Sequence, residues 1–283
     1  MAFRSWRRPS RRMVLTSVAA VAMTSVVGGV AYSAGAATQQ PAIQTSTPNR
    51  ADDVTNIDVL RQQLRNYYGD PLGTGNFAAD SNYAQEAQKV AAAGTRWISV
   101  PHHTSKQKAI VLDVDDTTLA TWNYEIASNW AFNPTSNADY VLNQKFPAVP
   151  GMVDMVKTAA REGYAIFYLT GRGAAQEKAT LGNLTSDGIG VDAGYPAPTT
   201  LTNGEDGLFT KPAVADYPDY LKQACADDPD GKCTTIHYKS ATRAHIESLG
   251  YEIVANFGDQ FSDLKGGFAD RTFKVPNPNY YLP

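Results

Sequence analysis

Residues 109–117 read Ala-Ile-Val-Leu-Asp-Val-Asp-Asp-Thr. The four consecutive apolar residues at 109–112 are typical of a strand that is buried on both faces, as in a parallel sheet covered by helices. If the chain continues in extended form, side chains two residues apart point to the same side, so Asp113 and Asp115 enter one cleft together. Two neighbouring carboxylates repel each other unless a cation or a shared proton compensates. This stretch therefore predicts a buried strand with an acidic site at its carboxyl end.

Alternating helix and strand patterns surround this strand. They predict helices at 57–68, 82–93, 152–161, 174–184 and 241–249, and strands at 164–169, 235–238, 252–257 and 272–275. The alternation indicates an α/β fold, a three-layer Rossmann-like parallel sheet with helices on both faces. Residues 118–150 interrupt it with many aromatic side chains and are expected to form a small helical cap insertion. Residues 188–232 form a connection that is longer than usual.

The other predicted strands also end in polar side chains, at the edge where ligands bind in open α/β sheets. The second ends in Thr170-Gly171-Arg172, which offers a hydroxyl, an unhindered N–H and a guanidinium to an oxyanion. The third ends just before Lys239. The fourth leads into Asp259 and Asp263, which are four residues apart and share a helical face. Carboxylates gathered in this way raise one another's pKa, so a hard cation is expected, and Mg²⁺ fits because it also binds substrate phosphate.

This order of motifs resembles the haloacid dehalogenase-like superfamily, whose phosphatases carry Asp-x-Asp-x-Thr, a Thr or Ser, a Lys and paired acids on four successive strands. The resemblance extends over residues 110–263. The ending Gly-Asp-x-x-x-Asp narrows it to the acid phosphatases with four aspartates. The segment 258–264, Gly-Asp-Gln-Phe-Ser-Asp-Leu, and the segment 276–281, Pro-Asn-Pro-Asn-Tyr-Tyr, resemble class B acid phosphatases related to plant vegetative storage proteins.

The resemblance implies a Mg²⁺-dependent acid phosphatase that hydrolyses phosphomonoesters through an aspartyl-phosphate. Asp113 would be the nucleophile, and Asp115 would protonate the leaving alcohol and later deprotonate the attacking water. The metal would be bound by Asp113, by the backbone carbonyl of Asp115, by Asp259 and by Asp263, the last directly or through water. A phosphotransferase that uses the same intermediate and a non-catalytic storage or binding protein of the same fold are the alternatives.

The resemblance also implies further roles around the phosphoryl group. Thr170 would bind a phosphoryl oxygen, and Lys239 would neutralise charge on the nucleophile and on the transferred group. Gly171 and Arg172 are candidate substrate contacts at the same strand end. Asn123, in the presumed cap, is another, with core packing as the alternative for the aromatic cluster around it.

The N-terminus has the pattern of an export signal. Five arginines precede an apolar run at 13–32 that ends in Ala34-Gly35-Ala36, which predicts a cleavable signal peptide at residues 1–36. The pair Arg11-Arg12 resembles a twin-arginine signal, with an ordinary secretory signal or a retained membrane anchor as the alternatives. Cleavage removes five of the 25 basic residues and none of the 28 acidic ones, leaving a net charge of −8. Such a charge argues against nucleic acid as a partner.

The rest of the chain is expected to form a flexible linker and one domain. Residues 37–52 are rich in Gln, Thr, Ser and Pro and predict the linker, and residues 53–283 would be the phosphatase domain. Cys225 and Cys233 lie in a polar loop and are expected to form a disulfide in an oxidising compartment, with a metal pair as the alternative. We expect a secreted or extracellular protein that acts on a small-molecule phosphomonoester and has no stable membrane insertion after cleavage.

Overall fold

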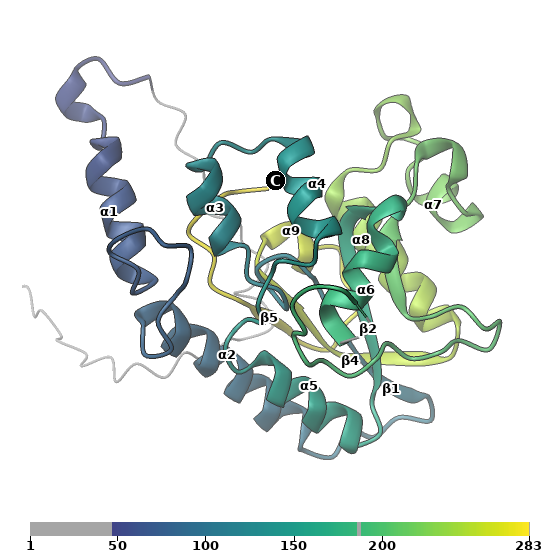
Figure 1. Cartoon of the computed structure of the whole chain (residues 1–283). Coiled ribbons are helices and arrows are strands. Elements are labelled where there is room, and N and C mark those ends of the chain that lie inside the picture. Colours follow the sequence, from purple (N-terminus) through teal and green to yellow (C-terminus); the bar gives the residue numbers. More distant parts are fainter. Residues whose placement is uncertain (1–46, 186–187, 283) are drawn as a thin grey trace, which may run out of the picture. The chain divides into compact units, whose positions relative to one another are not determined.

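A parallel sheet of five strands organises the protein, and the computed structural model describes residues 47–185 and 188–282. The strand order is β3-β2-β1-β4-β5 (Figure 1). The strands are β1 (Gln107–Leu112), β2 (Ala165–Gly173), β3 (Leu208–Lys211), β4 (Tyr251–Gly258) and β5 (Thr272–Lys274). β1 pairs with β2 on one side and with β4 on the other. The predicted α/β fold with a parallel sheet is therefore confirmed, with the acidic run following its central strand.

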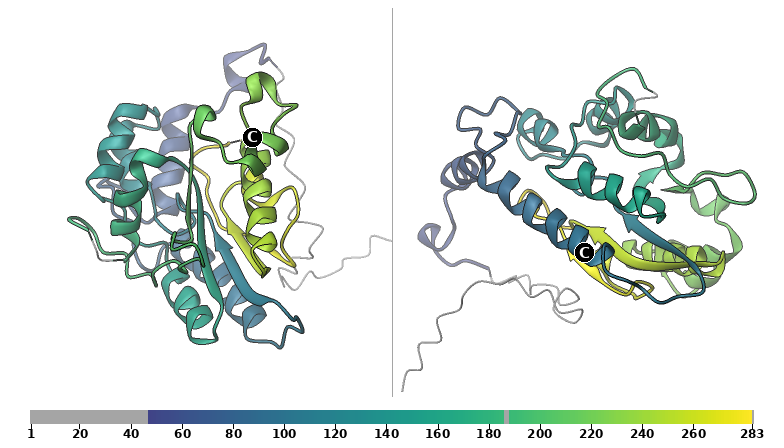
Figure 2. Two further views of the ribbon diagram at one scale, coloured as in Figure 1. Left: turned by 90° about the vertical axis from the view of Figure 1, so that its right-hand side faces the viewer. Right: turned by 90° about the horizontal axis from the view of Figure 1, so that it is seen from below.

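Helices cover both faces of this sheet. The helices of the described residues are α1 (Ile57–Tyr67), α2 (Asn82–Ile98), α3 (Trp122–Ser128), α4 (Pro134–Leu142), α5 (Met152–Arg161), α6 (Glu177–Thr185), α7 (Asp219–Ala224), α8 (Thr235–Ser248) and α9 (Phe261–Leu264), of which α1 does not pack on the sheet. α2 and α5 pack on one face, and α7 and α8 on the other. The left view of Figure 2 shows the strands between the teal helices and the yellow-green α8.

Alternate residues of β1 belong to different cores. Ile110 and Leu112 pack with α2 and α5, whereas Ala109 and Val111 pack against α7 and α8. Burial on both faces explains why the strand has no polar residue between Ala109 and Leu112. This alternation fixes which side chains of β1 face each core. The strand ends at Leu112, so Asp113 is the first residue at the carboxyl edge of the sheet.

The predicted strand at 235–238 is wrong, because these residues form the first turn of α8. The β-branched and aromatic side chains there favour a strand by propensity. Thr234, however, caps the helix by accepting a hydrogen bond from the His237 N–H at 3.1 Å. Tyr238, Thr242 and Ile246 are then buried at intervals of four residues, which is the spacing of one helical face.

The outer strand β3 lies inside the stretch that was predicted to be an irregular connection. Only four residues form it, and it pairs with β2 at the edge of the sheet. The stretch around it is rich in Gly, Pro and Asp, which favour turns and loops, so the sequence did not indicate a strand. Cys225, in the same stretch, and Cys233, directly after it, form the predicted disulfide and are buried in the core under α8.

Two short helices, α3 and α4, lie in the stretch predicted as a cap. Trp122 is fully buried and stacks on Tyr68 with ring centroids 4.0 Å apart. Tyr124 is also buried and packs edge-on against Phe132 and Tyr140. These aromatic side chains therefore pack within the fold.

The predicted signal peptide at 1–36 and most of the predicted linker at 37–52 lie outside the described residues. The described part of the linker, residues 47–52, is exposed to solvent. In the part of the chain that the structure describes, no helix has the length and apolar character needed to span a membrane.

Candidate active site

One pocket gathers side chains from the carboxyl ends of β1, β2 and β4 and from the first turn of α8. Its volume is about 330 Å³. The charged residues that line it include Asp113, Asp115, Arg172, Lys239, Asp259 and Asp263. Because the strands are parallel, the loops that follow β1, β2 and β4 meet at the same edge of the sheet. Lys239 joins them from α8, not from the end of a third strand as the sequence predicted.

Three buried carboxylates form the floor of this pocket. One oxygen each of Asp113, Asp259 and Asp263 lies within 4.8 Å of the others. The backbone N–H of Asp113 donates to the carbonyl of Phe257 at 3.0 Å, which ties the end of β1 to β4. A side chain at Gly258 would place its Cβ 2.4 Å from that of Asp263, so only glycine lets the turn after β4 bring Asp259 and Asp263 together.

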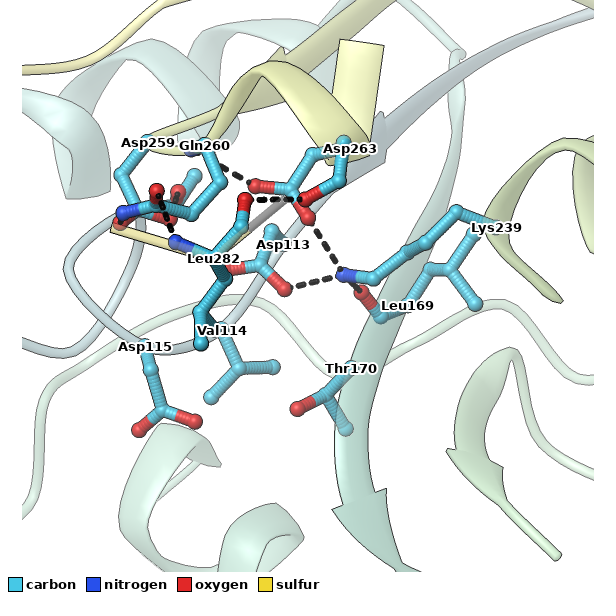
Figure 3. Close-up of polar contacts among 12 residues, drawn as sticks. Asp113, Val114, Asp115, Leu169, Thr170, Lys239, Asp259, Gln260, Asp263 and Leu282 are labelled. Atoms are coloured by element: carbon cyan, nitrogen blue, oxygen red, sulfur yellow. Dashed lines mark hydrogen bonds and ion pairs between the residues drawn. The ribbon is translucent and has the colours of Figure 1, made fainter. Parts of the chain in front are cut away.

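Lys239 lies between two of these acids. Its Nζ contacts Asp113, lies 3.1 Å from Asp263 Oδ1 and donates to the carbonyl of Leu169 at 2.5 Å (Figure 3). Burial opposes the charged form of Lys239, but the two carboxylates outweigh it and raise the lysine pKa. Lys239 is therefore a fixed positive charge in the pocket.

One lysine does not balance three buried carboxylates. Burial, with further contributions from Asp263, Asp259 and Asp115, raises the pKa of Asp113 well above its usual value despite the opposing effect of Lys239. Burial and the charges of Asp263 and Asp116 raise the pKa of Asp259 to about 8. Ligands of a small divalent ion at ~2.1 Å stand at most ~4.2 Å apart, so a small movement would let these three oxygens share one ion. The donor set fits a hard cation with oxygen ligands.

Asp115 lies away from the contact between Lys239 and Asp113 (Figure 3). Its carboxylate accepts two hydrogen bonds from the guanidinium of Arg172. Thr170 is fully buried, and its hydroxyl accepts a hydrogen bond from the Arg172 N–H at 3.1 Å. Gly171 lines the pocket beside Arg172. Asp113, Asp115 and Gly171 thus line one pocket as predicted, whereas Thr170, which precedes Gly171 and Arg172 in the chain, is buried and is not among the lining residues.

Asn123 does not lie with these residues. Its amide donates to the carbonyl of Lys145 at 2.8 Å, and it lines a separate, open cavity together with Thr74 and Gln144. The sequence placed Asn123 in the cap but could not show which way α3 would face. The structure thus gives no support to Asn123 as a contact for a substrate bound near Asp113.

Several residues of the site escaped the sequence analysis. Gln260 and Asn277 both donate to Asp259 Oδ2, each at 2.7 Å. Asp116 is fully buried beside them and accepts hydrogen bonds from the backbone and the hydroxyl of Thr121. Asn277 lies in the segment 276–281, whose sequence served only for the resemblance, since no local pattern indicates that it folds back to the acids.

A family profile described as HAD superfamily, subfamily IIIB (acid phosphatase), matches residues 30–283. The chain therefore belongs to the acid phosphatases of subfamily IIIB in that superfamily, which confirms the predicted resemblance.

Curated relatives and solved structures agree with this assignment. Acid phosphatase 1 of Solanum lycopersicum is 27% identical over 61% of this chain and 58% of its own length. The stem 28 kDa glycoprotein of Glycine max is 30% identical over 61% and 59%, and vegetative storage protein 2 of Arabidopsis thaliana is 25% identical over 61% and 56%. The matches thus span less than two thirds of these relatives. The class C acid phosphatase from Bacillus anthracis has the same fold, with a TM-score of 0.53 and 20% identity over 71% of this chain and 80% of its own.

Proposed function

We propose that the protein is an exported, Mg²⁺-dependent acid phosphatase that hydrolyses small phosphomonoesters through a phosphorylated Asp113. The observation that carries the proposal is the meeting of three buried carboxylates with Lys239 in one pocket. Membership of the acid phosphatase subfamily supports the reaction class. Buried carboxylates without a cation would only destabilise the fold, so their convergence needs a functional reason.

Asp113 is the proposed nucleophile because it is the first acid of the Asp-x-Asp-x-Thr motif and its carboxylate lines the pocket beside Lys239. In the first step an Asp113 oxygen forms a bond to phosphorus as the bond between phosphorus and the leaving oxygen breaks. Asp115 gives its proton to that oxygen, so the alcohol leaves neutral. In the second step Asp115 takes a proton from water, whose oxygen attacks phosphorus, and the bond to Asp113 breaks to release phosphate.

The surrounding residues orient and neutralise these groups. Lys239 keeps a positive charge beside Asp113 and the transferred group, and Thr170 offers a hydroxyl at the end of β2. Asp113, Asp259 and Asp263 would hold the metal, with the backbone carbonyl of Asp115 as a further ligand. Bound Mg²⁺ supplies positive charge that stabilises the phosphoryl oxygens in the transition state.

Export would bring the protein to an oxidising compartment, in which its disulfide is stable. The Cys225–Cys233 bond favours an oxidising environment, and the N-terminal arginines with the following apolar run fit a cleavable signal. The mature N-terminus of secreted protein, read by mass spectrometry, tests this. An intact Met1 in secreted material would contradict cleavage.

An aryl phosphate assay tests the enzymatic proposal. We expect turnover with Mg²⁺, and neither a chelated sample nor Asp113→Asn should be active. Asp154→Asn is the matched control, because Asp154 is an exposed acid on α5, and it should retain full activity. Full activity of Asp113→Asn would contradict the nucleophile, and an inactive but folded, metal-loaded protein would favour the storage alternative.

The phosphotransferase alternative is separated by its products. If the enzyme transfers phosphate to alcohols, part of the phosphate will go to added glycerol. The amount of substrate consumed will then exceed the amount of inorganic phosphate released. We expect the two quantities to stay equal.

A further inference from the structure

Residues 277–282 fold back over the edge of the sheet where the acids meet. Figure 1 shows the yellow end of the chain passing from β5 toward α3 and α4. Tyr280 and Leu282 line the pocket that contains Asp113. The backbone N–H of Leu282 donates to Gln260 Oε1 at 3.0 Å, and Ser262 Oγ donates to the Leu282 carbonyl at 3.2 Å. The 277–282 segment is therefore fastened to the turn that carries Asp259 and Asp263.

The first residue of this segment contacts a carboxylate of the site directly. Asn277 Nδ2 lies 2.7 Å from Asp259 Oδ2, and Gln260 Nε2 donates to the same oxygen at the same distance. Thr117 makes a longer hydrogen bond, 3.3 Å, to Oδ1. Because two amides occupy Oδ2, Oδ1 keeps more lone-pair capacity for a cation, and the plane of the carboxylate is fixed.

Asn277 also lies between two buried acids. Its Nδ2 is 3.4 Å from Asp116 Oδ2 as well as 2.7 Å from Asp259. An amide donates to both carboxylates without adding a charge, whereas lysine in its place would compete with a metal ion for Asp259. Asn277 is thus suited to hold Asp259 in place while leaving the charge of the site available to a cation.

We propose that Asn277 is a positioning residue for the metal ligand Asp259, so that the 277–282 segment sets the affinity of the site for Mg²⁺. This inference rests on the metal site of the proposed function. Hydrogen-bond partners of metal ligands orient the ligand and increase its affinity, and their loss commonly weakens metal binding by about 10- to 100-fold. Among the hydrogen bonds of the described residues, Asn277 makes none to Lys239 or Asp115. Its substitution should therefore change the affinity for the metal ion.

Calorimetric titration of the metal-free protein with Mg²⁺ provides the direct test. We expect Asn277→Ala to weaken Mg²⁺ binding about 10- to 100-fold. In an aryl phosphate assay the same variant should need correspondingly more Mg²⁺, and saturating Mg²⁺ should restore kcat to within a few fold of the unmutated protein. A residue with only a structural role would lower kcat at every metal concentration.

Asn279→Ala is the matched control. Asn279 belongs to the same segment but bonds to Tyr68 and Trp130, with no hydrogen bond to Asp259. We expect its Mg²⁺ affinity to stay within about twofold of the unmutated value. Unchanged Mg²⁺ binding by Asn277→Ala would overturn the inference, as would equal weakening by both variants, because the segment would then matter only as a whole. If the unmutated protein itself bound no Mg²⁺, the metal site of the proposed function would fail instead.

Discussion

Arg172 holds both carboxylate oxygens of Asp115: its Nη2 lies 2.6 Å from Oδ1, and its Nε lies 3.1 Å from Oδ2. The guanidinium is itself fixed, because Nη1 donates to Thr180 at 3.0 Å and the group lies over the ring of Phe146. The side chain of Arg172 is 4% exposed, whereas that of Asp115 is 31% exposed. A bidentate pair of this kind fixes the plane of the carboxylate. Arg172 thus fixes the orientation of the Asp115 carboxylate in the pocket.

Replacing the guanidinium of Arg172 by the ammonium of a lysine tests whether Arg172 orients Asp115 or binds substrate. Arg172→Lys keeps the charge but loses the two parallel hydrogen bonds. We expect kcat to fall with little change in KM, and by less than the roughly 10²- to 10⁴-fold loss expected when Asp115→Asn removes the acid and base. Steady-state kinetics on an aryl phosphate measure both. A rise in KM with unchanged kcat would instead support a substrate contact.

Asp259→Asn should make the metal-free protein more stable and should reduce the stabilisation of the protein by Mg²⁺. The folded-state pKa of Asp259, about 8, lies above the ordinary 3.8, chiefly because of burial. The metal-free folded state therefore loses stability as the pH rises from about 4 to about 8. In chelator at pH 8, Asp259→Asn should be more stable than the unmutated protein.

With Mg²⁺ the stability advantage of Asp259→Asn should shrink. A ligand at 100 times its Kd stabilises a fold by about 2.7 kcal/mol, and Asp259→Asn should lose most of this gain. Thermal denaturation in chelator and in Mg²⁺ measures both effects. Equal stabilisation of the two proteins by Mg²⁺ would exclude Asp259 as a ligand.

The sequence predicted the central strand and its acids well because both depend on local features. Residues 109–112 are apolar without interruption, and Asp113 follows at once, so strand and site are encoded in nine consecutive residues. Asp259 follows β4 in the same way. Because the two strands are parallel, the acids that follow them lie at the same edge of the sheet. Their proximity can therefore be predicted without knowing any distant contact.

The remaining features depend on contacts that no local pattern contains. The segment at 235–238 has strand propensity, and only the cap at Thr234 and the packing of Tyr238 against β3 make it helical. Lys239 nevertheless lines the pocket, because the first turn of α8 reaches the same edge of the sheet. Asn277 reaches Asp259 across 18 residues of sequence, which spacing alone could not indicate.

Glu125 should make the stability of the fold depend on pH. It lies on α3 with 8% of its surface exposed, and burial, with a smaller contribution from the charge of Asp115, raises its pKa from 4.5 to about 7. The folded state therefore holds this proton more tightly than the unfolded state. Ionisation of Glu125 destabilises the fold increasingly between about pH 4.5 and pH 7, on the order of 2–3 kcal/mol in total.

Glu125→Gln should remove this dependence. We expect the variant to be more stable than the unmutated protein at pH 8 and similar to it at pH 4.5, as measured by urea denaturation across that range. Asp154→Asn, on the exposed face of α5, should follow the unmutated curve. A variant less stable than the unmutated protein at pH 8 would show that Glu125 is needed as an anion.

Arg243 should be the residue whose loss most weakens the turn after β4. It is fully buried in α8 and donates to the carbonyls of Asp263 at 2.6 Å, Gly267 at 2.9 Å and Lys265. Burial lowers its pKa to about 10, so it remains cationic at neutral pH. One guanidinium thus bonds to three backbone carbonyls of this turn, and the carbonyl of Asp263 also accepts a hydrogen bond from Asn256 Nδ2 at 2.9 Å.

Arg243→Met removes all three donors while keeping an apolar stem. Each buried polar group that loses its partner costs about 1–3 kcal/mol, and the Asp263 carbonyl keeps its bond from Asn256, so the free energy of unfolding should fall by about 2 kcal/mol or more. Because one of the carbonyls belongs to Asp263, Mg²⁺ affinity should fall as well. Urea denaturation and titration with Mg²⁺ measure the two effects. Arg96→Met, an exposed arginine on α2, should change stability by less than about 0.5 kcal/mol, and an equally small change in Arg243→Met would contradict the role of Arg243 in holding the turn.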